Sequence, residues 1–182
     1  MNVKESHELI IEMHPHADSL NKKLIREADK VALKGYKNPY FTNLGGTKLP
    51  LSEDNDAPSK LVQSWVTELI KIKFHYKKNQ DPIDYEVTGW FANYDRGEYA
   101  NSHHHLPFSI FSFVYFIKCP KGSSPLIFST TGKRLKAEEG KIVIFPSSMM
   151  HHVPSNKCED RRVLAGNFLP YRMDSERMQR VG

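Results

Sequence analysis

Histidines are concentrated in two short clusters of this sequence. Five of the nine lie in His103-His104-His105 and His151-His152. Side chains alternate faces along an extended strand, so His103 and His105 would point one way and His104 the other. An H-x-H pair can hold one metal ion. His151 or His152 could complete a three-residue set that leaves coordination positions open for substrate and oxygen.

Other interpretations of these clusters stay open. Three imidazoles also suit catalytic zinc. A histidine triplet by itself is compatible with a solvated loop or an adventitious metal site. The second cluster follows a buried-strand and proline pattern at residues 141–146, and this favours a metal centre over incidental surface histidines.

Arg161-Arg162 opens an apolar, β-prone run at residues 163–168. A guanidinium at the start of an apolar strand is costly to bury unless it pairs with an anion. Its planar fork suits a carboxylate. Because neighbouring residues face opposite sides of a strand, we expect one arginine to be exposed and the other to bind a carboxylate of a dicarboxylic cosubstrate.

The N-terminal part of the chain has helical periodicity. Asp18 or Ser19 could cap a first helix, and a second amphipathic helix is predicted after Pro58. A short strand is predicted at residues 9–11, and residues 43–58 are expected to form a long loop. The apolar stripe of the second helix comprises Leu61, Val62, Trp65, Val66, Leu69, Ile70 and Phe74.

Short β-prone runs separated by turns replace the helices from residue 85 onward. The predicted strands are Tyr85–Tyr94, Ile110–Lys118, Leu126–Ser129, Lys141–Phe145 and Arg162–Phe168. This spacing is typical of a sandwich or barrel. The predicted fold is mainly β, of the α+β type: a cupin-like jelly roll, or double-stranded β-helix, with N-terminal helices packed on one sheet. Its ligand site would lie in the mouth of the barrel.

Length and composition favour one domain over residues 1–182. Within it we expect a helical bracing segment at 1–80, a jelly-roll core at 81–170 and a C-terminal tail at 171–182. The net charge of +5 is modest and spread along the chain, so a nucleic-acid partner is unsupported. Without an apolar run long enough for a bilayer or a secretory signal pattern, a soluble cytoplasmic protein with no membrane partner is expected.

The ordered motifs of residues 85–168 resemble those of the iron(II)/2-oxoglutarate-dependent oxygenases. More narrowly, they are similar to a branch of small bacterial and phage members that carries an H-x-H motif. The resemblance covers about half of the chain. It rests on Trp90, Asn93, Gly97-x-Tyr99, His103-x-His105, the run 112–116, the run 140–147, His151 and Arg161 through Asn167.

This resemblance implies an Fe(II) site formed by His103, His105 and His151. His105 stands where most of the superfamily has Asp or Glu. If His105 is not a ligand, water or chloride could occupy its position. The nearby acids lack the family spacing; they are Asp95, Glu98, Glu159 and Asp160.

The resemblance also implies a site for 2-oxoglutarate. The six-residue spacing to Asn167 favours Arg161 as the partner of its distal carboxylate, with Arg162 as the alternative. Further candidates are Tyr115 as a second donor to that carboxylate, and Asn93 and Tyr99 as residues lining the mouth.

The function implied by the resemblance is that of a dioxygenase, an oxidoreductase that uses Fe(II), 2-oxoglutarate and O2. It would hydroxylate an amino acid, a peptide or a small metabolite and produce succinate and CO2. The motifs specify neither this substrate nor an oligomeric state. Two alternatives remain: a cupin-like metal enzyme that does not use 2-oxoglutarate, such as a three-His dioxygenase or an isomerase, and a non-catalytic β-sandwich binding module.

Overall fold

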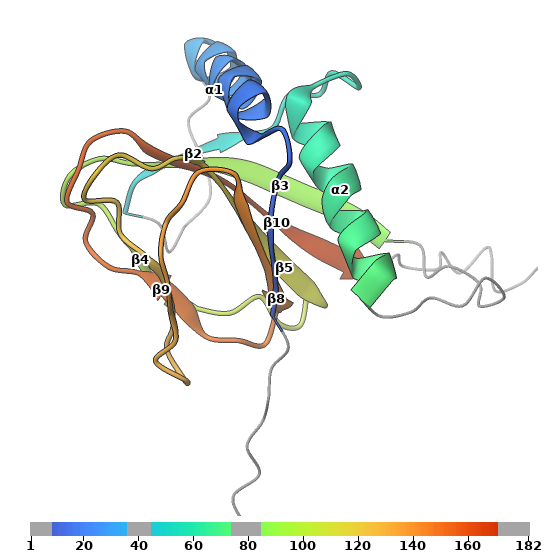
Figure 1. Ribbon diagram of the computed structural model, residues 1–182, viewed down its shortest axis with the longest axis vertical. Helices are drawn as coiled ribbons and strands as arrows, with labels where there is room; N and C mark the ends of the chain where they lie inside the picture. Colours follow the sequence, from blue (N-terminus) through green and yellow to red (C-terminus); the bar gives the residue numbers. More distant parts are fainter. Residues whose placement is uncertain (1–8, 36–44, 74–84, 171–182) are drawn as a thin grey trace, which may run out of the picture.

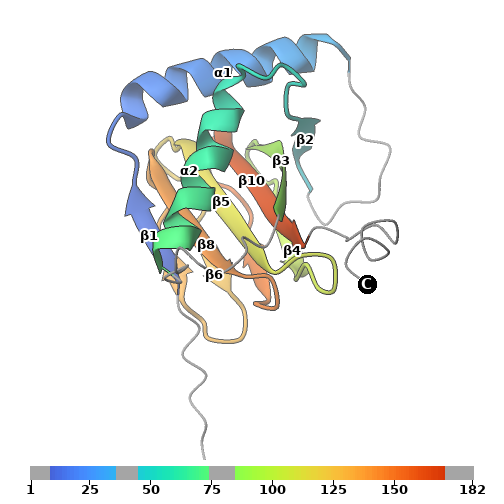
Figure 2. The same cartoon turned by 90° about the vertical axis from the view of Figure 1, so that its right-hand side faces the viewer.

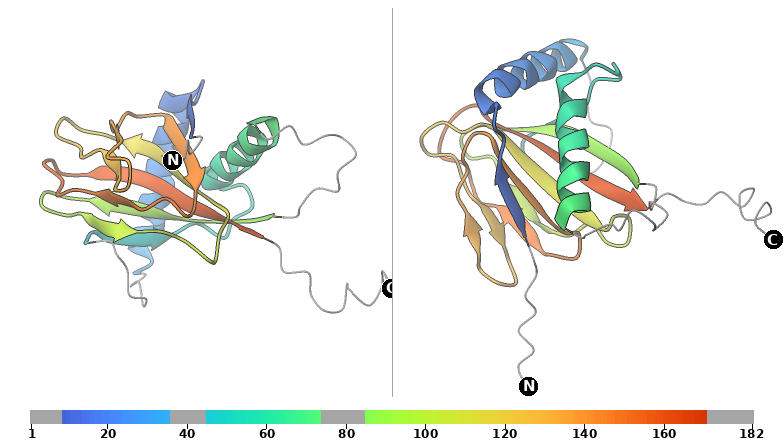
Figure 3. Two further views of the ribbon diagram at one scale, coloured as in Figure 1. Left: turned by 90° about the horizontal axis from the view of Figure 1, so that it is seen from below. Right: turned by 45° about the vertical axis from the view of Figure 1, so that its right-hand side comes forward.

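A computed structural model describes residues 9–35, 45–73 and 85–170 of the chain. This part folds into two antiparallel β-sheets and two helices, and both helices cover the outer face of the larger sheet (Figure 1). The smaller sheet lies on the opposite side of the larger one (Figure 3). The predicted double-stranded β-helix with helices on one sheet is therefore confirmed.

The larger sheet has six strands in the order β1-β8-β5-β10-β3-β2. Its central strand, β10, pairs with β3 along ten residues and with β5 on its other side. Side chains on β10 are therefore held in register from both edges. The strands are β1 (Ile10–Met13), β2 (Thr47–Pro50), β3 (Tyr85–Tyr94), β5 (Phe111–Lys118), β8 (Lys141–Pro146) and β10 (Arg161–Pro170).

The smaller sheet has four short strands in the order β4-β9-β6-β7. None of them exceeds four residues, so this sheet depends on packing against the larger one. The strands are β4 (Ala100–His103), β6 (Leu126–Phe128), β7 (Arg134–Leu135) and β9 (His151–Val153).

Strand alternation divides the apolar residues of the larger sheet between two cores. One set packs under the helices and includes Phe91, Tyr115 and Leu164. The other set faces the smaller sheet and includes Phe116 and Val163. The inner core is the one that encloses a pocket, as described below.

Helices α1 (Ala17–Leu33) and α2 (Pro58–Lys73) form where the apolar residues recur at three- and four-residue steps. Figure 2 shows α2 crossing the strands of the larger sheet, with α1 lying across one end. The residues of these helices that face the core are Leu20, Leu24, Ala28, Val31, Val62, Val66 and Ile70. The described part of the chain contains no helix long and apolar enough to cross a membrane.

Some details differ from the sequence-based predictions. The first helix begins at Ala17 after His16, without a side-chain cap, so neither Asp18 nor Ser19 caps it. Leu61 was assigned to the apolar stripe of α2 but is exposed. The predicted loop at 43–58 contains strand β2, which pairs with β3 at the edge of the sheet. An edge strand tolerates Pro50 because one side of its backbone needs no partner.

Phe74 and the predicted tail at 171–182 lie outside the described residues.

A buried carboxylate joins the two helices. Glu27 of α1 accepts hydrogen bonds from the Ser52 and Ser59 backbone N–H groups and from the Ser59 hydroxyl, at 3.2, 2.9 and 2.6 Å. Ser59 is the second residue of α2, so the carboxylate takes up a backbone donor that the helix itself leaves unpaired. A negative charge at this end of the helix is also favourable for its dipole.

Replacing this carboxylate should destabilise the fold. Glu27→Gln retains the shape but converts one acceptor into a donor facing other donors, so we expect the free energy of unfolding to fall by about 1–3 kcal/mol. Urea denaturation measures the change. The Glu68→Gln variant, at an exposed position on α2, loses only a surface ion pair with Lys71. Its free energy of unfolding should therefore fall by less than about 0.5 kcal/mol. Equal stabilities for the two variants would contradict this account.

Candidate active site

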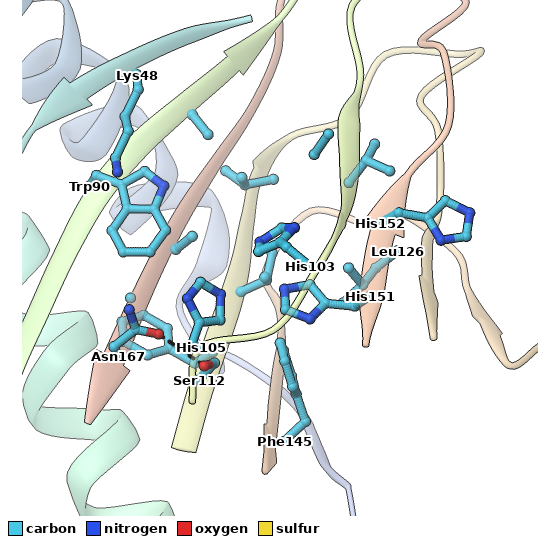
Figure 4. A pocket seen from close by; sticks show the side chains of 18 of the residues that line it. Lys48, Trp90, His103, His105, Ser112, Leu126, Phe145, His151, His152 and Asn167 are labelled. Atoms are coloured by element: carbon cyan, nitrogen blue, oxygen red, sulfur yellow. Dashed lines mark hydrogen bonds between the residues drawn. The ribbon is translucent and has the colours of Figure 1, made fainter. Parts of the chain in front are cut away.

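A pocket of about 290 Å³ lies between the two sheets. Its walls come from the inner faces of β3, β5 and β10 and from the segments that carry the two histidine clusters (Figure 4). This volume is at the lower end of the range for small-molecule sites. The pocket is therefore suited to a small ligand or a single side chain.

His103, His105 and His151 converge on one point in this pocket (Figure 4). His103 and His151 are directly opposite each other in the β4–β9 ladder. His105 follows the end of β4, where its backbone N–H donates to the Ser147 carbonyl at 2.9 Å. One ring nitrogen from each histidine lies within 4.8 Å of the others. Such a group could hold one metal ion.

Hydrogen bonds orient two of these imidazoles. The Nδ1 atom of His103 lies 2.7 Å from the Asn101 carbonyl, and that of His151 lies 2.8 Å from the Met149 carbonyl. A carbonyl oxygen only accepts, so each Nδ1 carries the proton and each Nε2 keeps a free lone pair. This is the arrangement that commonly orients metal-binding histidines.

Burial favours the neutral form of all three imidazoles. It lowers the pKa of His103, and the Asn101 hydrogen bond only partly opposes this. It lowers the pKa of His105 to about 4 and that of His151 to about 3, and repulsion from neighbouring histidines contributes further. Neutral imidazole is the form that binds metal. The residues thus fit a divalent cation chemically as well as geometrically.

The two remaining clustered histidines lie at the rim. His104 is exposed, and its Nδ1 accepts from the Leu106 backbone N–H at 3.2 Å. The His152 ring turns away from the other three, and its Nδ1 lies 2.9 Å from the Ser129 hydroxyl (Figure 4). Neither belongs to the converging group.

The four acids near the clusters do not supply a ligand. Within the described residues, no Asp or Glu lines the pocket or joins the histidine group. These acids instead fix the surrounding loops: Asp95, Glu98, Glu159 and Asp160 accept hydrogen bonds from neighbouring backbone or basic groups.

Arg161 lines the pocket and is almost completely buried, with 1% of its surface exposed. Its Nε and Nη1 atoms find no hydrogen-bond partner among the described residues. The guanidinium carbon lies 4.6 Å from the centre of the Tyr94 ring and 5.7 Å from that of Phe116. Burial lowers the pKa of Arg161, but arginine remains charged in proteins. A buried, incompletely paired cation is expected to receive an anion.

Arg162 faces the other side of the sheet. It forms ion pairs with Asp160 and, at 2.6 Å, with Asp29 of α1. Its charge is therefore already balanced, and it does not line the pocket. The structure places Arg161 and not Arg162 where a pocket ligand would meet it.

Three other predicted site residues do not line the pocket. Tyr115 belongs to the helix-side core, where its hydroxyl donates to Asn21 Oδ1 at 2.7 Å. The structure does not place Tyr115 where it could donate to a carboxylate in the pocket, because alternation along β5 turns it away. Asn93 occupies the corresponding face of β3, opposite Arg162. Tyr99 is exposed beside Gly45, whose backbone N–H donates to the Tyr99 carbonyl at 2.7 Å.

Residues that the sequence analysis did not assign line the pocket instead. Tyr94 takes the place expected for Tyr115 beside Arg161, and alternation along β3 from Trp90 could have identified it. Lys48 of β2 reaches in over the Trp90 ring, at 4.3 Å from its centre. No sequence signal indicated Lys48 because its strand was predicted as loop.

A chain of hydroxyl groups orients a pocket amide. Ser147 lies 2.6 Å from the Ser109 hydroxyl and 2.8 Å from that of Ser112. Ser112 in turn donates to Asn167 Oδ1 at 2.9 Å. Because the Asn167 oxygen is occupied, its amide nitrogen is left to donate towards the pocket (Figure 4).

We expect His151 and His152 to respond differently to substitution. His151→Ala removes one of three converging imidazoles and should weaken Fe(II) or Co(II) binding by more than about 100-fold, because loss of an outer partner alone costs about 10- to 100-fold. His152→Ala should stay close to the wild type. Anaerobic metal titration gives both affinities, and circular dichroism checks folding. Equal losses in the two variants would contradict the assignment.

Tyr115→Phe should affect the fold and not the pocket. The substitution leaves buried Asn21 Oδ1 without its donor, so we expect a loss of about 1–2 kcal/mol in the free energy of unfolding. Metal affinity should be unchanged. Denaturant unfolding and metal titration of the same variant test both parts. Unchanged stability together with weaker ligand binding would instead indicate that Tyr115 belongs to the site.

Comparisons with known proteins identify the fold. No protein-family model matches the chain, and no curated protein sequence matches it significantly. Among solved structures, a Pseudomonas putida prolyl-4-hydroxylase is 20% identical, with a TM-score of 0.71 over 91% of this chain and 94% of the other. A viral collagen prolyl hydroxylase from Paramecium bursaria Chlorella virus-1, as its 2OG complex, is 14% identical, with a TM-score of 0.73 over 94% and 100%.

A Trichoplax adhaerens prolyl hydroxylase, in complex with a hypoxia inducible factor peptide fragment, is also similar. It is 12% identical, with a TM-score of 0.68 over 97% of this chain and 88% of the other. At these identities the likeness concerns the backbone. The chain thus has the double-stranded β-helix fold seen in these hydroxylases.

Proposed function

We propose that this chain is an Fe(II)- and 2-oxoglutarate-dependent dioxygenase that hydroxylates an amino acid, a peptide or a small metabolite. The observation that carries the proposal is Arg161, a buried guanidinium with two unpaired donor atoms in the same pocket as three converging neutral histidines. A metal site alone would not require that cation. A dicarboxylate that also binds the metal would use both.

His103, His105 and His151 would hold the metal. Fe(II), when bound with 2-oxoglutarate and O2, supplies oxidative decarboxylation to succinate and CO2, with one oxygen atom passing to the substrate. The protein contributes three converging imidazoles and a pocket whose walls include apolar side chains. Because the three protein ligands are neutral, the charge of the metal would be balanced by the bound dicarboxylate and not by the protein.

Arg161 would bind the distal carboxylate of 2-oxoglutarate. The planar guanidinium presents parallel donors that match the two oxygens of a carboxylate. Tyr94 and Phe116 cover its faces, which limits access of water to the ion pair. Phe116 also belongs to the inner apolar core. In these surroundings the cation attracts a carboxylate more strongly than it would at the surface.

The size of the pocket bears on the substrate. A volume of about 290 Å³ suits a small molecule or one side chain of a peptide. The similar Trichoplax structure holds a peptide fragment, which is compatible with the second of these. The described pocket has no acidic residue that would repel a negatively charged substrate.

Arg161→Met separates this proposal from its alternatives. We expect 2-oxoglutarate binding to the Mn(II)-loaded protein to weaken by at least about 30-fold, because truncating one partner of a buried charge pair costs 2 kcal/mol or more. Metal affinity should be retained. The stability of the ligand-free protein should stay equal or rise, because an unpaired buried charge is removed. Calorimetry, succinate analysis and denaturant unfolding provide the three measurements.

Arg162→Met is the matched control. It removes a charge that is paired on the other face, so 2-oxoglutarate affinity should stay within about twofold. Unchanged 2-oxoglutarate binding in Arg161→Met, with metal binding intact, would instead favour a cupin-like metal enzyme that uses no such cosubstrate. Absence of metal binding in the untagged wild type would favour a non-catalytic binding module.

A further inference from the structure

Lys48 places a second cation at the pocket, at a position that the proposed cosubstrate does not require. Its ammonium group is half-buried and lies over the face of Trp90. Burial lowers its pKa, as expected for a charge that has lost part of its hydration. Within the described residues it has no carboxylate partner. The structure therefore contains two pocket cations, Lys48 and Arg161, without an acid to balance either.

The two cations occupy different ends of one strand face. Arg161 pairs with Tyr94 in the β10–β3 ladder and lies on its ring, whereas Lys48 lies on the ring of Trp90. Trp90 and Tyr94 are four residues apart along β3, which corresponds to about 13 Å. Arg161 accounts for the distal carboxylate of the proposed cosubstrate. The charge of Lys48 is thus left without an assigned partner.

The Lys48 end adjoins the candidate metal centre. The Trp90 ring centre lies 6.2 Å from that of His105, one of the three converging imidazoles. Figure 4 shows the Asn167 amide on the same side of the pocket, beneath Trp90. Because Ser112 occupies the Asn167 oxygen, the amide nitrogen is a donor facing this space. One ammonium, one amide donor and one indole face therefore border the space next to the metal ligands.

We infer that Lys48, Trp90 and Asn167 form a substrate subsite that binds a carboxylate group of the molecule to be hydroxylated. This inference rests on the proposed function and specifies its substrate class. A single ammonium balances the single negative charge of a carboxylate, whereas a phosphate dianion would leave excess charge. Trp90 would pack against the carbon skeleton, and Asn167 would donate to a carboxylate oxygen. The substrate is accordingly a small carboxylic acid, such as a free amino acid.

Ligand binding without turnover tests this subsite. Mn(II)-loaded protein, with and without 2-oxoglutarate, is titrated with the protein amino acids, their C-terminal amides, the N-acetylated amides of aspartate and glutamate, and inorganic phosphate. Thermal shift identifies binders, and calorimetry measures their affinities. We expect at least one free amino acid to bind and its amide to bind about 10- to 100-fold more weakly. Binding of only the N-acetylated acidic amides would support a side-chain carboxylate as the source.

Variants of Lys48 test the residue itself. Lys48→Met should weaken binding of the identified carboxylate about 10- to 100-fold, Lys48→Arg should restore most of it, and 2-oxoglutarate affinity should be unchanged in both. Lys22→Met, at an exposed position on α1, is the matched control and should behave as the wild type.

Several results would overturn the inference. These are equal affinities for acids and amides of amino acids that have no side-chain carboxylate, binding of phosphate alone, binding of no carboxylate in the panel, or unchanged binding in Lys48→Met. Loss of 2-oxoglutarate affinity in Lys48→Met would assign Lys48 to the cosubstrate and also overturn it. If the wild type binds amino acids through Lys48 but does not bind 2-oxoglutarate, the subsite is supported and the proposed cosubstrate is not.

Discussion

The alternation of side chains along the strands of the larger sheet is the constraint on which the site depends. β10 is paired on both edges, so a shift of one residue would exchange its two faces and break both ladders. This register sends Arg161 into the pocket and Arg162 towards α1. The same rule on β5 turns Ser112 inward and Tyr115 outward. The helices support the site because they bury the side chains on the outward face of the larger sheet.

The sequence allowed the fold and the centre of the site to be predicted better than its periphery. Two combinations in the sequence are unusual: histidines clustered next to a buried-strand pattern, and an arginine at the start of an apolar strand. Burying such polar groups costs free energy, and binding of a ligand offsets that cost. The outward placement of Tyr115 was not foreseen because its aromatic neighbours on both faces of β5 hide the alternation. Lys48 was missed because its strand is short, lies at an edge and ends in a proline, all features of a loop. Such contacts depend on tertiary pairing and not on local pattern.

Charge in the pocket is distributed in an unusual way. Among the described residues, the lining contains two non-histidine cations and no acid, and the candidate metal ligands are neutral. A metal centre with one carboxylate among its protein ligands would carry one more negative charge than a centre with three neutral histidines. The excess positive charge disfavours the empty pocket and favours anionic ligands in a poorly hydrated space. Binding of a metal would increase this preference, so metal and anions should bind cooperatively.

The hydrogen bonds of His103 and His151 run to carbonyl oxygens two residues earlier in the chain, at Asn101 and Met149. These acceptors belong to the backbone, so no side-chain substitution can remove them. The orientation of both imidazoles is consequently insulated from sequence change around them. His105 makes no such bond within the described part of the chain. If a metal binds as proposed, His105 is therefore the position at which a substitution would most readily change the electronic properties of that metal.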